Sequence, residues 1–280
     1  MSLEQFAFER VQRLIYSHAG IVLESGKEYL VEARLAPIAR NCGLARVDDL
    51  IAQLDTKPDL AIQVVEAMTT NETSFFRDRR PFELIRKEII PELIRKREDR
   101  RTLNIWCAAC SSGQEPYSIA MLVRDNFPHL ASWSVHIFAT DISSIILERA
   151  RGARFSQLEV NRGLGAAQLV KHFQRLGLQW ELKSDLKNMV SFAQLNLNAS
   201  WPILPIFDLV FLRNVMIYFD METKRKVLAK LCERVAQDGY IFLGGGESTL
   251  NIDTKLERVE FENAGCYRIA SPSPNRAQLP

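Results

Sequence analysis

Apolar residues in the first part of the chain recur at nearly helical spacing, and no convincing strand pattern accompanies them. Such segments lie at residues 6–15, 30–38 and 62–68. The segment 83–101 is strongly charged and is also expected to be helical. We therefore predict an all-α N-terminal domain over residues 1–85, with the domain junction in the charged helix.

The pattern changes after Thr102, where short apolar runs alternate with helical segments. Strands are expected at residues 103–107, 135–139, 189–192, 208–211 and 240–243, and helices at 116–125 and 145–150. Strands that alternate with helices form a parallel sheet covered on both faces. The last apolar segments, 256–262 and 265–269, read instead as an antiparallel hairpin. We predict an α/β domain over residues 86–270.

One stretch does not fit this alternation. Glycines interrupt the chain between residues 151 and 188, and a short strand candidate spans residues 178–182. We interpret 151–188 as a small inserted β-subdomain, and insertions of this kind commonly carry partner recognition. The final residues, 271–280, contain three prolines and are predicted to be a disordered tail.

Composition and charge narrow the function classes. The 280 residues are 47% hydrophobic and 25% charged, which is typical of a soluble globular protein. The formal net charge of +2 provides no basic face for nucleic acid. No apolar run approaches the roughly 20 residues of a membrane helix, and the first ten residues lack the apolar core of a signal peptide. An odd number of cysteines without framework spacing suits a reducing compartment, so we expect a cytoplasmic enzyme.

The first candidate site is the turn after the first predicted strand, residues 107–116. Ligands of open α/β sheets bind beyond the carboxyl ends of the strands, and the small residues here would let a ligand approach the backbone. Pro116 is expected at the first position of the next helix. Glu115 beside it suits an ammonium or a sulfonium better than a phosphate. The competing interpretation is a tight strand-to-helix turn that binds nothing.

The second candidate is Asp141, at the end of the second predicted strand. A carboxylate in this position can accept hydrogen bonds from both ribose hydroxyls of an adenosyl group. The competing interpretation is that Asp141 is the N-cap of the following helix. Together with the turn at 107–116, Asp141 indicates a nucleoside ligand.

Two further segments carry groups suited to chemistry. Residues 69–78 combine amide, hydroxyl, aromatic and guanidinium side chains, although they could also form a capped turn into a helix near Pro81. An apolar strand delivers Arg213 and Asn214 at its carboxyl end, and Tyr218 follows four residues later. Tyr218 could equally be a core aromatic residue whose hydroxyl is satisfied locally.

A Trp-Cys-x-x-Cys sequence at Cys107 and Cys110 allows a competing interpretation as a thiol oxidoreductase. A redox pair needs an exposed thiolate of low pKa, whereas Cys107 lies in an apolar strand and Glu115 would oppose a thiolate. Zinc needs four ligands, and no second cysteine pair or histidine cluster supplies them. We therefore expect neither redox chemistry nor a metal site.

Four segments resemble motifs of the chemotaxis receptor methyltransferase (CheR) family, in the family's order and spacing. They are TTNETSFFRD (69–78), AACSSGQEPYS (108–118), ATDIS (139–143) and RNVMIYF (213–219). The resemblance extends from the N-terminal helices to about residue 270. It implies a Rossmann-like class I methyltransferase sheet with a small inserted β-subdomain, preceded by an all-α domain.

The resemblance also implies a cofactor, a reaction and a partner. The cofactor would be S-adenosylmethionine, with S-adenosylhomocysteine as product. The reaction would be methyl esterification of glutamate side chains on the cytoplasmic helical region of chemoreceptors, in chemotaxis adaptation or a related signalling pathway. A glutamate carboxylate is already ionised at neutral pH, with a pKa of about 4.3, so this protein-glutamate O-methyltransferase chemistry needs no general base.

Matching motif positions imply the residues of the site. The cofactor site would comprise Asn71, Thr73, Arg77, Glu115, Asp141, Asn196, Leu197, Arg213 and Asn214. Within it, Asn196 and Leu197 would flank the adenine. The catalytic residues beside the transferred methyl would be Arg77 and Tyr218.

The sequence departs from the family in two places. Residues 244–248 lack the histidine that many members have there, and the segment 173–182 is shorter than in members that dock on a receptor's C-terminal tethering peptide. The shorter segment predicts activity that is independent of a tether. We also expect a monomer. Basic residues of the second helix resemble the receptor-contacting face, although they could be a solvated face instead: Lys27, Arg34, Arg40 and Arg46.

Two alternatives of other classes stay open on the sequence. One is a noncatalytic module that binds S-adenosylmethionine or S-adenosylhomocysteine and docks on a partner. The other is a methyltransferase of the same fold that acts on a small molecule or on RNA. Intact Arg77 and Tyr218 favour an enzyme, and the near-neutral charge disfavours RNA.

Overall fold

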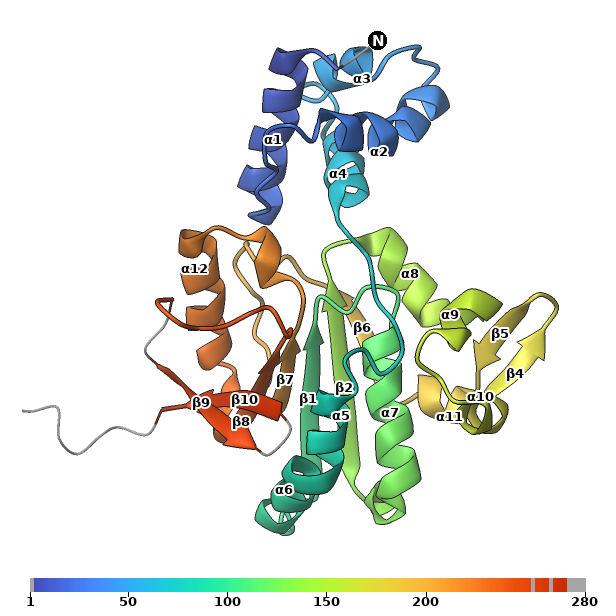
Figure 1. Ribbon diagram of the computed structural model, residues 1–280, viewed down its shortest axis with the longest axis vertical. Helices are drawn as coiled ribbons and strands as arrows, with labels where there is room; N and C mark the ends of the chain where they lie inside the picture. Colours follow the sequence, from blue (N-terminus) through green and yellow to red (C-terminus); the bar gives the residue numbers. More distant parts are fainter. Residues whose placement is uncertain (1–2, 253–254, 262–263, 271–280) are drawn as a thin grey trace, which may run out of the picture.

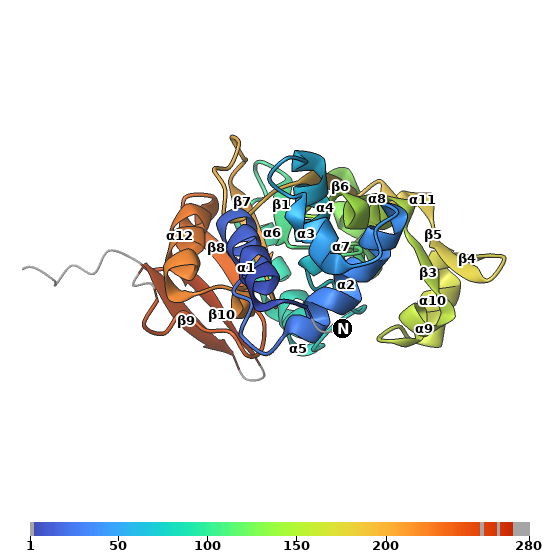
Figure 2. The same cartoon turned by 90° about the horizontal axis from the view of Figure 1, so that it is seen from above.

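The structure, a computed structural model, describes residues 3–252, 255–261 and 264–270. A helical N-terminal domain stands above an α/β domain, and a small subdomain projects from the side of the latter (Figure 1). Seen from above, the helical domain lies between helix α12 (Met221–Cys232) and this subdomain (Figure 2). The predicted tail at 271–280 lies outside the described residues, as does part of the predicted turn of the last hairpin, at residues 262–263.

The helical domain packs around its own apolar cluster. Its helices are α1 (Gln5–Ala19), α2 (Glu28–Asn41), α3 (Val47–Ala52) and α4 (Pro58–Met68). Gly20 follows the last residue of α1 with a φ of 70°, and its backbone N–H donates to the carbonyl of Tyr16. Helix α4 begins at a proline. The cluster includes Phe8, Val11 and Leu35, each of which is fully buried. This packing confirms the predicted all-α domain.

The change from one core to the other occurs earlier than the expected boundary at residue 85. Met68 still belongs to the helical cluster, whereas Phe75 and Phe82 belong to the cluster of the α/β domain. The irregular segment between them, residues 69–79, connects α4 to α5, and we call it the strap. The burial of Phe75 cannot be recognised from the hydrophobic pattern, because the strap is neither helix nor strand.

The predicted helix at 83–101 is shorter and less regular than expected. It consists of α5 (Arg80–Leu84), a π-helical segment η1 (Ile85–Ile89) and α6 (Ile90–Lys96). Pro91 lacks the N–H that would continue an α-helical ladder, which accounts for the irregularity just before it.

The main sheet contains the strands that the apolar runs predicted. They are β1 (Thr102–Ala108), β2 (Ser134–Asp141), β6 (Val190–Gln194), β7 (Phe207–Leu212), β8 (Val235–Leu243), β9 (Leu256–Phe261) and β10 (Ala264–Ile269). Their order is β6-β2-β1-β7-β8-β10-β9, parallel as far as β8 and antiparallel at β10 and β9. The chain extends the sheet to one side of β1 first and then returns to its other side at β7. The carboxyl ends of β1 and β7 therefore form the switch point where open α/β sheets bind ligands.

Helices cover both faces of this sheet, as the alternation predicted. They are α7 (Gln114–Asn126), η2 (Pro128–Ser132), α8 (Ser144–Gly152), η3 (Met216–Tyr218) and α12 (Met221–Cys232). Alternate residues of β1 face opposite clusters: Ile105 packs with α7 and α8, and Trp106 packs with α12. The predicted α/β fold class is confirmed.

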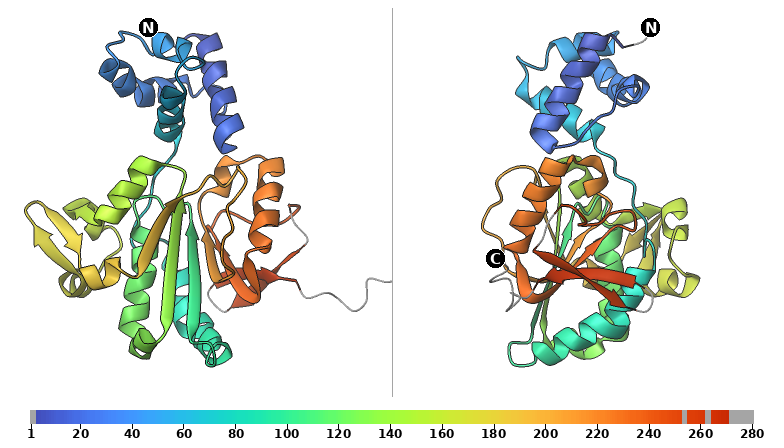
Figure 3. Two further views of the ribbon diagram at one scale, coloured as in Figure 1. Left: turned by 180° about the vertical axis from the view of Figure 1, so that it is seen from behind. Right: turned by 60° about the vertical axis from the view of Figure 1, so that its left-hand side comes forward.

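The inserted segment forms a separate small unit at one side of the sheet (Figure 3). Its elements are β3 (Arg154–Ser156), α9 (Gln157–Asn161), α10 (Ala166–His172), β4 (Phe173–Leu176), β5 (Gln179–Leu182) and α11 (Ser184–Lys187). Strand β5 matches the strand candidate at 178–182 and forms a hairpin with β4, and β3 adds to the other edge of β5. The sequence did not indicate β3, α9 or α10, because each is too short to show a period.

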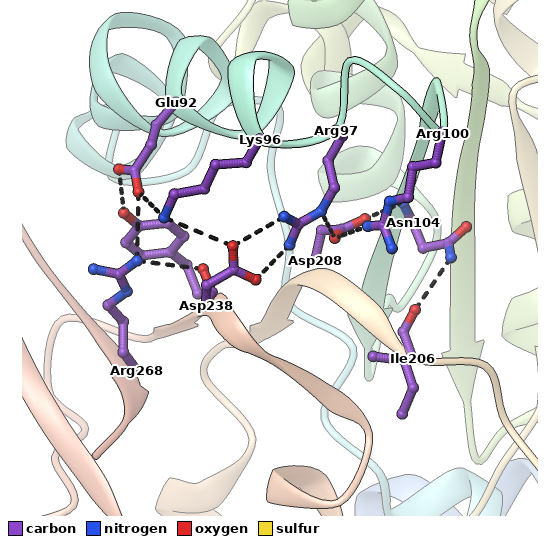
Figure 4. Close-up of polar contacts among 10 residues, drawn as sticks. Glu92, Lys96, Arg97, Arg100, Asn104, Ile206, Asp208, Asp238 and Arg268 are labelled. Atoms are coloured by element: carbon purple, nitrogen blue, oxygen red, sulfur yellow. Dashed lines mark hydrogen bonds and ion pairs between the residues drawn. The ribbon is translucent and has the colours of Figure 1, made fainter. Parts of the chain in front are cut away.

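A network of ion pairs fixes α6 to the amino-terminal ends of the sheet strands (Figure 4). Asp208 on β7, with a side chain only 1% exposed, accepts hydrogen bonds from Arg97 (2.8 Å), from Arg100 (2.5 Å) and from the backbone N–H of Asn104 (2.9 Å). The guanidinium of Arg97 also binds Asp238, and these hydrogen bonds lower the pKa of Asp238 to about 2.

Removing the charge at Asp208 should destabilise the fold strongly. Asp208→Asn removes the buried carboxylate that Arg97 and Arg100 share and leaves Arg97 with Asp238 alone. Each hydrogen bond to a charged group contributes about 1.5–3 kcal/mol. Urea unfolding at pH 7 measures this loss. The matched control is Asp185→Asn, an exposed partner of Arg124, which should cost less than about 1 kcal/mol. Equal losses in the two variants would contradict this reading of the network.

Candidate functional site

A pocket lies at the switch point, between the helical domain and the carboxyl ends of the parallel strands. It contains about 900 Å³ of space, part of it open to solvent. Every predicted site residue lines it: Asn71, Thr73, Arg77, Glu115, Asp141, Asn196, Leu197, Arg213, Asn214 and Tyr218. The structure thus brings together residues from segments that are far apart in the chain.

The turn after β1 forms the floor of the pocket. Left-handed backbone at Ala109 and Ser111 and a φ of 91° at Gly113 turn the chain sharply from strand to helix. An added Cβ at Gly113 would press on Tyr117 and Ala150, so this position requires glycine. Helix α7 begins at Gln114, which makes Pro116 its third residue and corrects the expected first position.

Asp141 connects the ends of β1 and β2. Its carboxylate accepts hydrogen bonds from the backbone N–H groups of Ser111 (2.8 Å) and Ser143 (3.1 Å). The N-cap of α8 is Ser143, whose hydroxyl accepts from the N–H of Ile146, so the interpretation of Asp141 as the cap is wrong. Burial raises the pKa of Asp141, and a further hydrogen-bond donor would therefore stabilise the carboxylate.

Arg213 occupies the centre of the site, at the end of β7. Its side chain is 1% exposed, and its guanidinium forms ion pairs with Glu115 (2.6 Å) and with Asp78 of the strap (2.7 Å). It also donates to the carbonyl of Arg77 (2.9 Å). Burial raises the pKa of Glu115, an effect that Arg213 opposes. Asp78, to which the sequence assigned no role, is thus part of the site.

The loop after β7 carries Asn214 and Tyr218, and Glu247 holds it. The Glu247 carboxylate accepts hydrogen bonds from the backbone N–H groups of Asn214 (2.8 Å), Ile217 (3.2 Å) and Gly244 (2.7 Å). A Cβ at Gly244 would lie 2.6 Å from the side-chain amide nitrogen of Asn214. The sequence drew attention to residues 244–248 only for a missing histidine, and it gave no indication that a glutamate there organises the neighbouring loop.

The helical domain forms the roof of the pocket, which the sequence did not predict. Ala19 and Ile21 line the cavity, and the backbone N–H of Val22 donates to the carbonyl of Tyr218 (2.8 Å). The side-chain amide of Asn196 donates to the carbonyl of His18 (2.6 Å). The two domains therefore share one binding cavity.

Glu66 of α4 adds a second contact between the two domains. Its side chain is buried, and its carboxylate accepts a hydrogen bond from the backbone N–H of Ser144 at the start of α8 (2.6 Å). A carboxylate is favourable in this position, since the N-terminus of a helix carries partial positive charge. The orientation of the roof is thus fixed on the side of α8 as well.

Two of the four basic residues on the expected face of α2 make contacts within the chain, and a receptor-contacting role of this face stays a prediction. Arg34 turns inward, where it donates to the carbonyls of Met68 (2.6 Å) and Thr69 (2.9 Å). Arg46 forms ion pairs with Glu4 (3.1 Å) and Asp48 (2.9 Å). These two side chains organise the domain instead of forming a free surface charge.

The cysteine pair is unsuited to redox chemistry. Cys107 and Cys110 are both buried, and burial raises the pKa of each thiol well above its ordinary value. In the described part of the chain, no group of at least three His, Cys, Asp or Glu side chains could hold a metal ion.

Within residues 3–252, 255–261 and 264–270, no helix is long and apolar enough to cross a bilayer.

Known proteins resemble the whole chain. Residues 7–69 match the model of the CheR methyltransferase all-alpha domain, and residues 71–264 match that of the CheR methyltransferase SAM binding domain. Chemotaxis protein methyltransferase 1 of Pseudomonas aeruginosa is 38% identical over 96% of this chain and 99% of its own length. Chemotaxis protein methyltransferase of Escherichia coli is 34% identical over 91% of this chain and 89% of its own length. The two domains, their shared pocket and these similarities lead to one conclusion: the chain belongs to the CheR methyltransferase family, whose members depend on S-adenosylmethionine.

Proposed function

We propose that this chain transfers the methyl group of S-adenosylmethionine to glutamate carboxylates of chemoreceptors, as a protein-glutamate O-methyltransferase. The observation that carries the proposal is that Arg77 and Tyr218 line the same pocket as the carboxylates of Glu115 and Asp141. Relatives in Pseudomonas and Vibrio are named chemotaxis protein methyltransferases, and the match covers nearly their full length. A pocket that also has an open side could admit a side chain from a second protein.

The donor set of the pocket fits S-adenosylmethionine. Asp141 offers a carboxylate at the end of β2, where it would accept the ribose hydroxyls. Asn196 and Leu197, just after β6, would flank the adenine. Arg213 adds a buried guanidinium to the lining, and its Nε has no hydrogen-bond partner within the described residues. Five other residues of the pocket lining would hold the methionyl part: Asn71, Thr73, Arg77, Glu115 and Asn214.

The chain's own task in methyl transfer is alignment. The cofactor supplies an electrophilic methyl, which moves from sulfur to a carboxylate oxygen while the S–C electron pair stays on sulfur. The substrate carboxylate is ionised at neutral pH, so Arg77 and Tyr218 would orient it by hydrogen bonds and remove no proton. Alignment of two reactants can supply about 7–11 kcal/mol of the barrier reduction. The buried walls of the pocket would exclude water from the reacting atoms.

The proposal extends to tether independence, oligomeric state and location in the cell. The hairpin between β4 and β5 is short, with only Gly177 and Leu178 between its strands, which supports activity without a receptor tethering peptide. We also propose a cytoplasmic monomer. Methylation of a receptor fragment that lacks its C-terminal peptide would test tether independence directly.

The reaction itself is testable with methyl-labelled S-adenosylmethionine and the cytoplasmic fragment of a chemoreceptor from the same organism. We expect label on receptor glutamates and its complete release as methanol by mild base, because glutamyl methyl esters are base-labile. A fragment with its modified glutamates changed to alanine is the control and should take up no label. Base-stable label, or binding of the cofactor without any transfer, would contradict the proposal.

Tyr218 should matter for turnover more than for cofactor binding. Tyr218→Phe removes only the hydroxyl that orients the carboxylate, so we expect kcat to fall about 10- to 100-fold. Affinity for S-adenosylhomocysteine, measured by calorimetry, should stay within about twofold. Tyr16→Phe is the matched control, since its hydroxyl binds Asp220 outside the pocket. Unchanged turnover in Tyr218→Phe would remove this hydroxyl from the mechanism.

Asp141 should show the opposite behaviour. Asp141→Asn replaces charged acceptors of the ribose by a neutral amide, and hydrogen bonds to charged groups contribute about 1.5–3 kcal/mol. Affinity for S-adenosylhomocysteine should therefore fall about 10- to 100-fold, while turnover at saturating cofactor changes much less. A calorimetric titration that gives the same affinity as the wild type would show that Asp141 does not bind the nucleoside.

A further inference from the structure

The inserted subdomain packs directly against the strap. Gly163, in the loop between α9 and α10, has a φ of 109°, and a Cβ added there would overlap the carbonyl oxygen of Phe75. Backbone of the subdomain therefore touches backbone of the strap, and a side chain at this position would displace one of them. Phe75 lies two residues before Arg77.

An aromatic cluster fixes the same point. The ring of Phe75 is fully buried between Phe155 of β3 and Phe173 of β4, with ring centroids 4.9 and 5.6 Å apart and edge-on geometry. Edge-on aromatic pairs at such distances stabilise a packing arrangement beyond the burial of their area. The subdomain thus provides one wall of the site in which the middle of the strap is buried.

A polar chain continues from the subdomain to Arg77. Arg162 forms an ion pair with the carboxylate of Glu72 (2.6 Å). The guanidinium of Arg77 donates to the backbone carbonyl of Glu72 (2.9 Å). The hydrogen bond from Arg162 lowers the pKa of Glu72, to which the charge of Arg77 also contributes. Glu72 therefore lies between a side chain of the subdomain and one of the pocket.

We propose that the inserted subdomain is a brace for the strap, and that Gly163, Arg162 and Glu72 are positioning residues that hold Arg77 in place for methyl transfer. The inference rests on the proposed role of Arg77. It makes the subdomain part of the catalytic unit, because a shift of the loop at Gly163 shifts the strap with it. A displacement of about 1 Å in an active site can cost 10²-fold in rate.

Two glycines of the subdomain allow a matched test. Gly163→Ala adds a methyl against the strap, whereas Gly177→Ala adds one at a position that also has positive φ (59°) but meets nothing within 4 Å. We expect kcat to fall about 10- to 100-fold in Gly163→Ala and to stay within about twofold in Gly177→Ala. Equal kcat in the two variants, with melting temperatures near the wild type, would overturn the inference.

A double-mutant cycle decides the question if Gly163→Ala does not fold. The pair of Arg162 and Glu72 is exposed, so Arg162→Gln and Glu72→Gln should fold and should each lower kcat by about two- to fivefold. The double variant should lose no more than either single variant. Arg154→Gln, in an exposed pair with Glu181 within the subdomain, is the control and should leave kcat unchanged. Unchanged kcat in both single variants would overturn the inference.

The two proposals fail in different ways in this assay. Wild-type enzyme that transfers no methyl to receptor fragments would refute the proposed function, and the inference would fall with it. Wild-type enzyme with full activity whose variants at Gly163, Arg162 and Glu72 retain that activity would refute the brace alone.

Discussion

The buried charge of Arg213 is the constraint around which the pocket is assembled. A guanidinium with a 1% exposed side chain must be paired, because an isolated charge in the interior is far too costly. Its partners come from separate parts of the chain, since Glu115 opens α7 and Asp78 ends the strap. Neutralising one charge at the end of β7 therefore draws the strap and the turn after β1 to the same place. The cofactor pocket is the space that remains among these segments.

The helical domain depends on this assembly and completes it. Its contacts with the α/β domain include two local hydrogen bonds. The Glu66 carboxylate accepts from the backbone N–H of Ser144, and the N–H of Val22 donates to the carbonyl of Tyr218. Each contact ends on a segment that also lines the pocket or leads directly into it. The orientation of the roof and the shape of the site are thus set by the same hydrogen bonds.

Much of this architecture follows from the sequence by simple rules. Buried strands such as β1 and β7 appear as apolar runs, and the rule for switch points places Glu115, Asp141 and Arg213 together before any coordinates are known. Glu115, Asp141 and Arg213 were predictable because they follow the carboxyl ends of buried strands. Asn71, Thr73 and Arg77 of the strap, in contrast, were singled out only by the family resemblance. Their individual roles stay predictions of the family resemblance.

Other features could not be predicted because they arise from contacts between distant segments. Phe75 shows no periodic pattern, yet it is fully buried between two strands of the inserted subdomain. Glu247 acts on backbone N–H groups more than 25 residues away in the chain, which leaves no local signal. The ion pairs of Asp208 with Arg97 and Arg100 likewise join residues whose proximity only the folded sheet defines.

We infer that the charge pairing at Arg213 builds a single site for S-adenosylmethionine between the two domains. A crystal structure with S-adenosylhomocysteine would test this inference. We expect the ligand in this pocket, with its ribose hydroxyls on the carboxylate of Asp141 and its sulfur facing Arg77 and Tyr218. A ligand found elsewhere, for example in the groove between α7 and the inserted subdomain that Phe82 and Gln168 line, would contradict it.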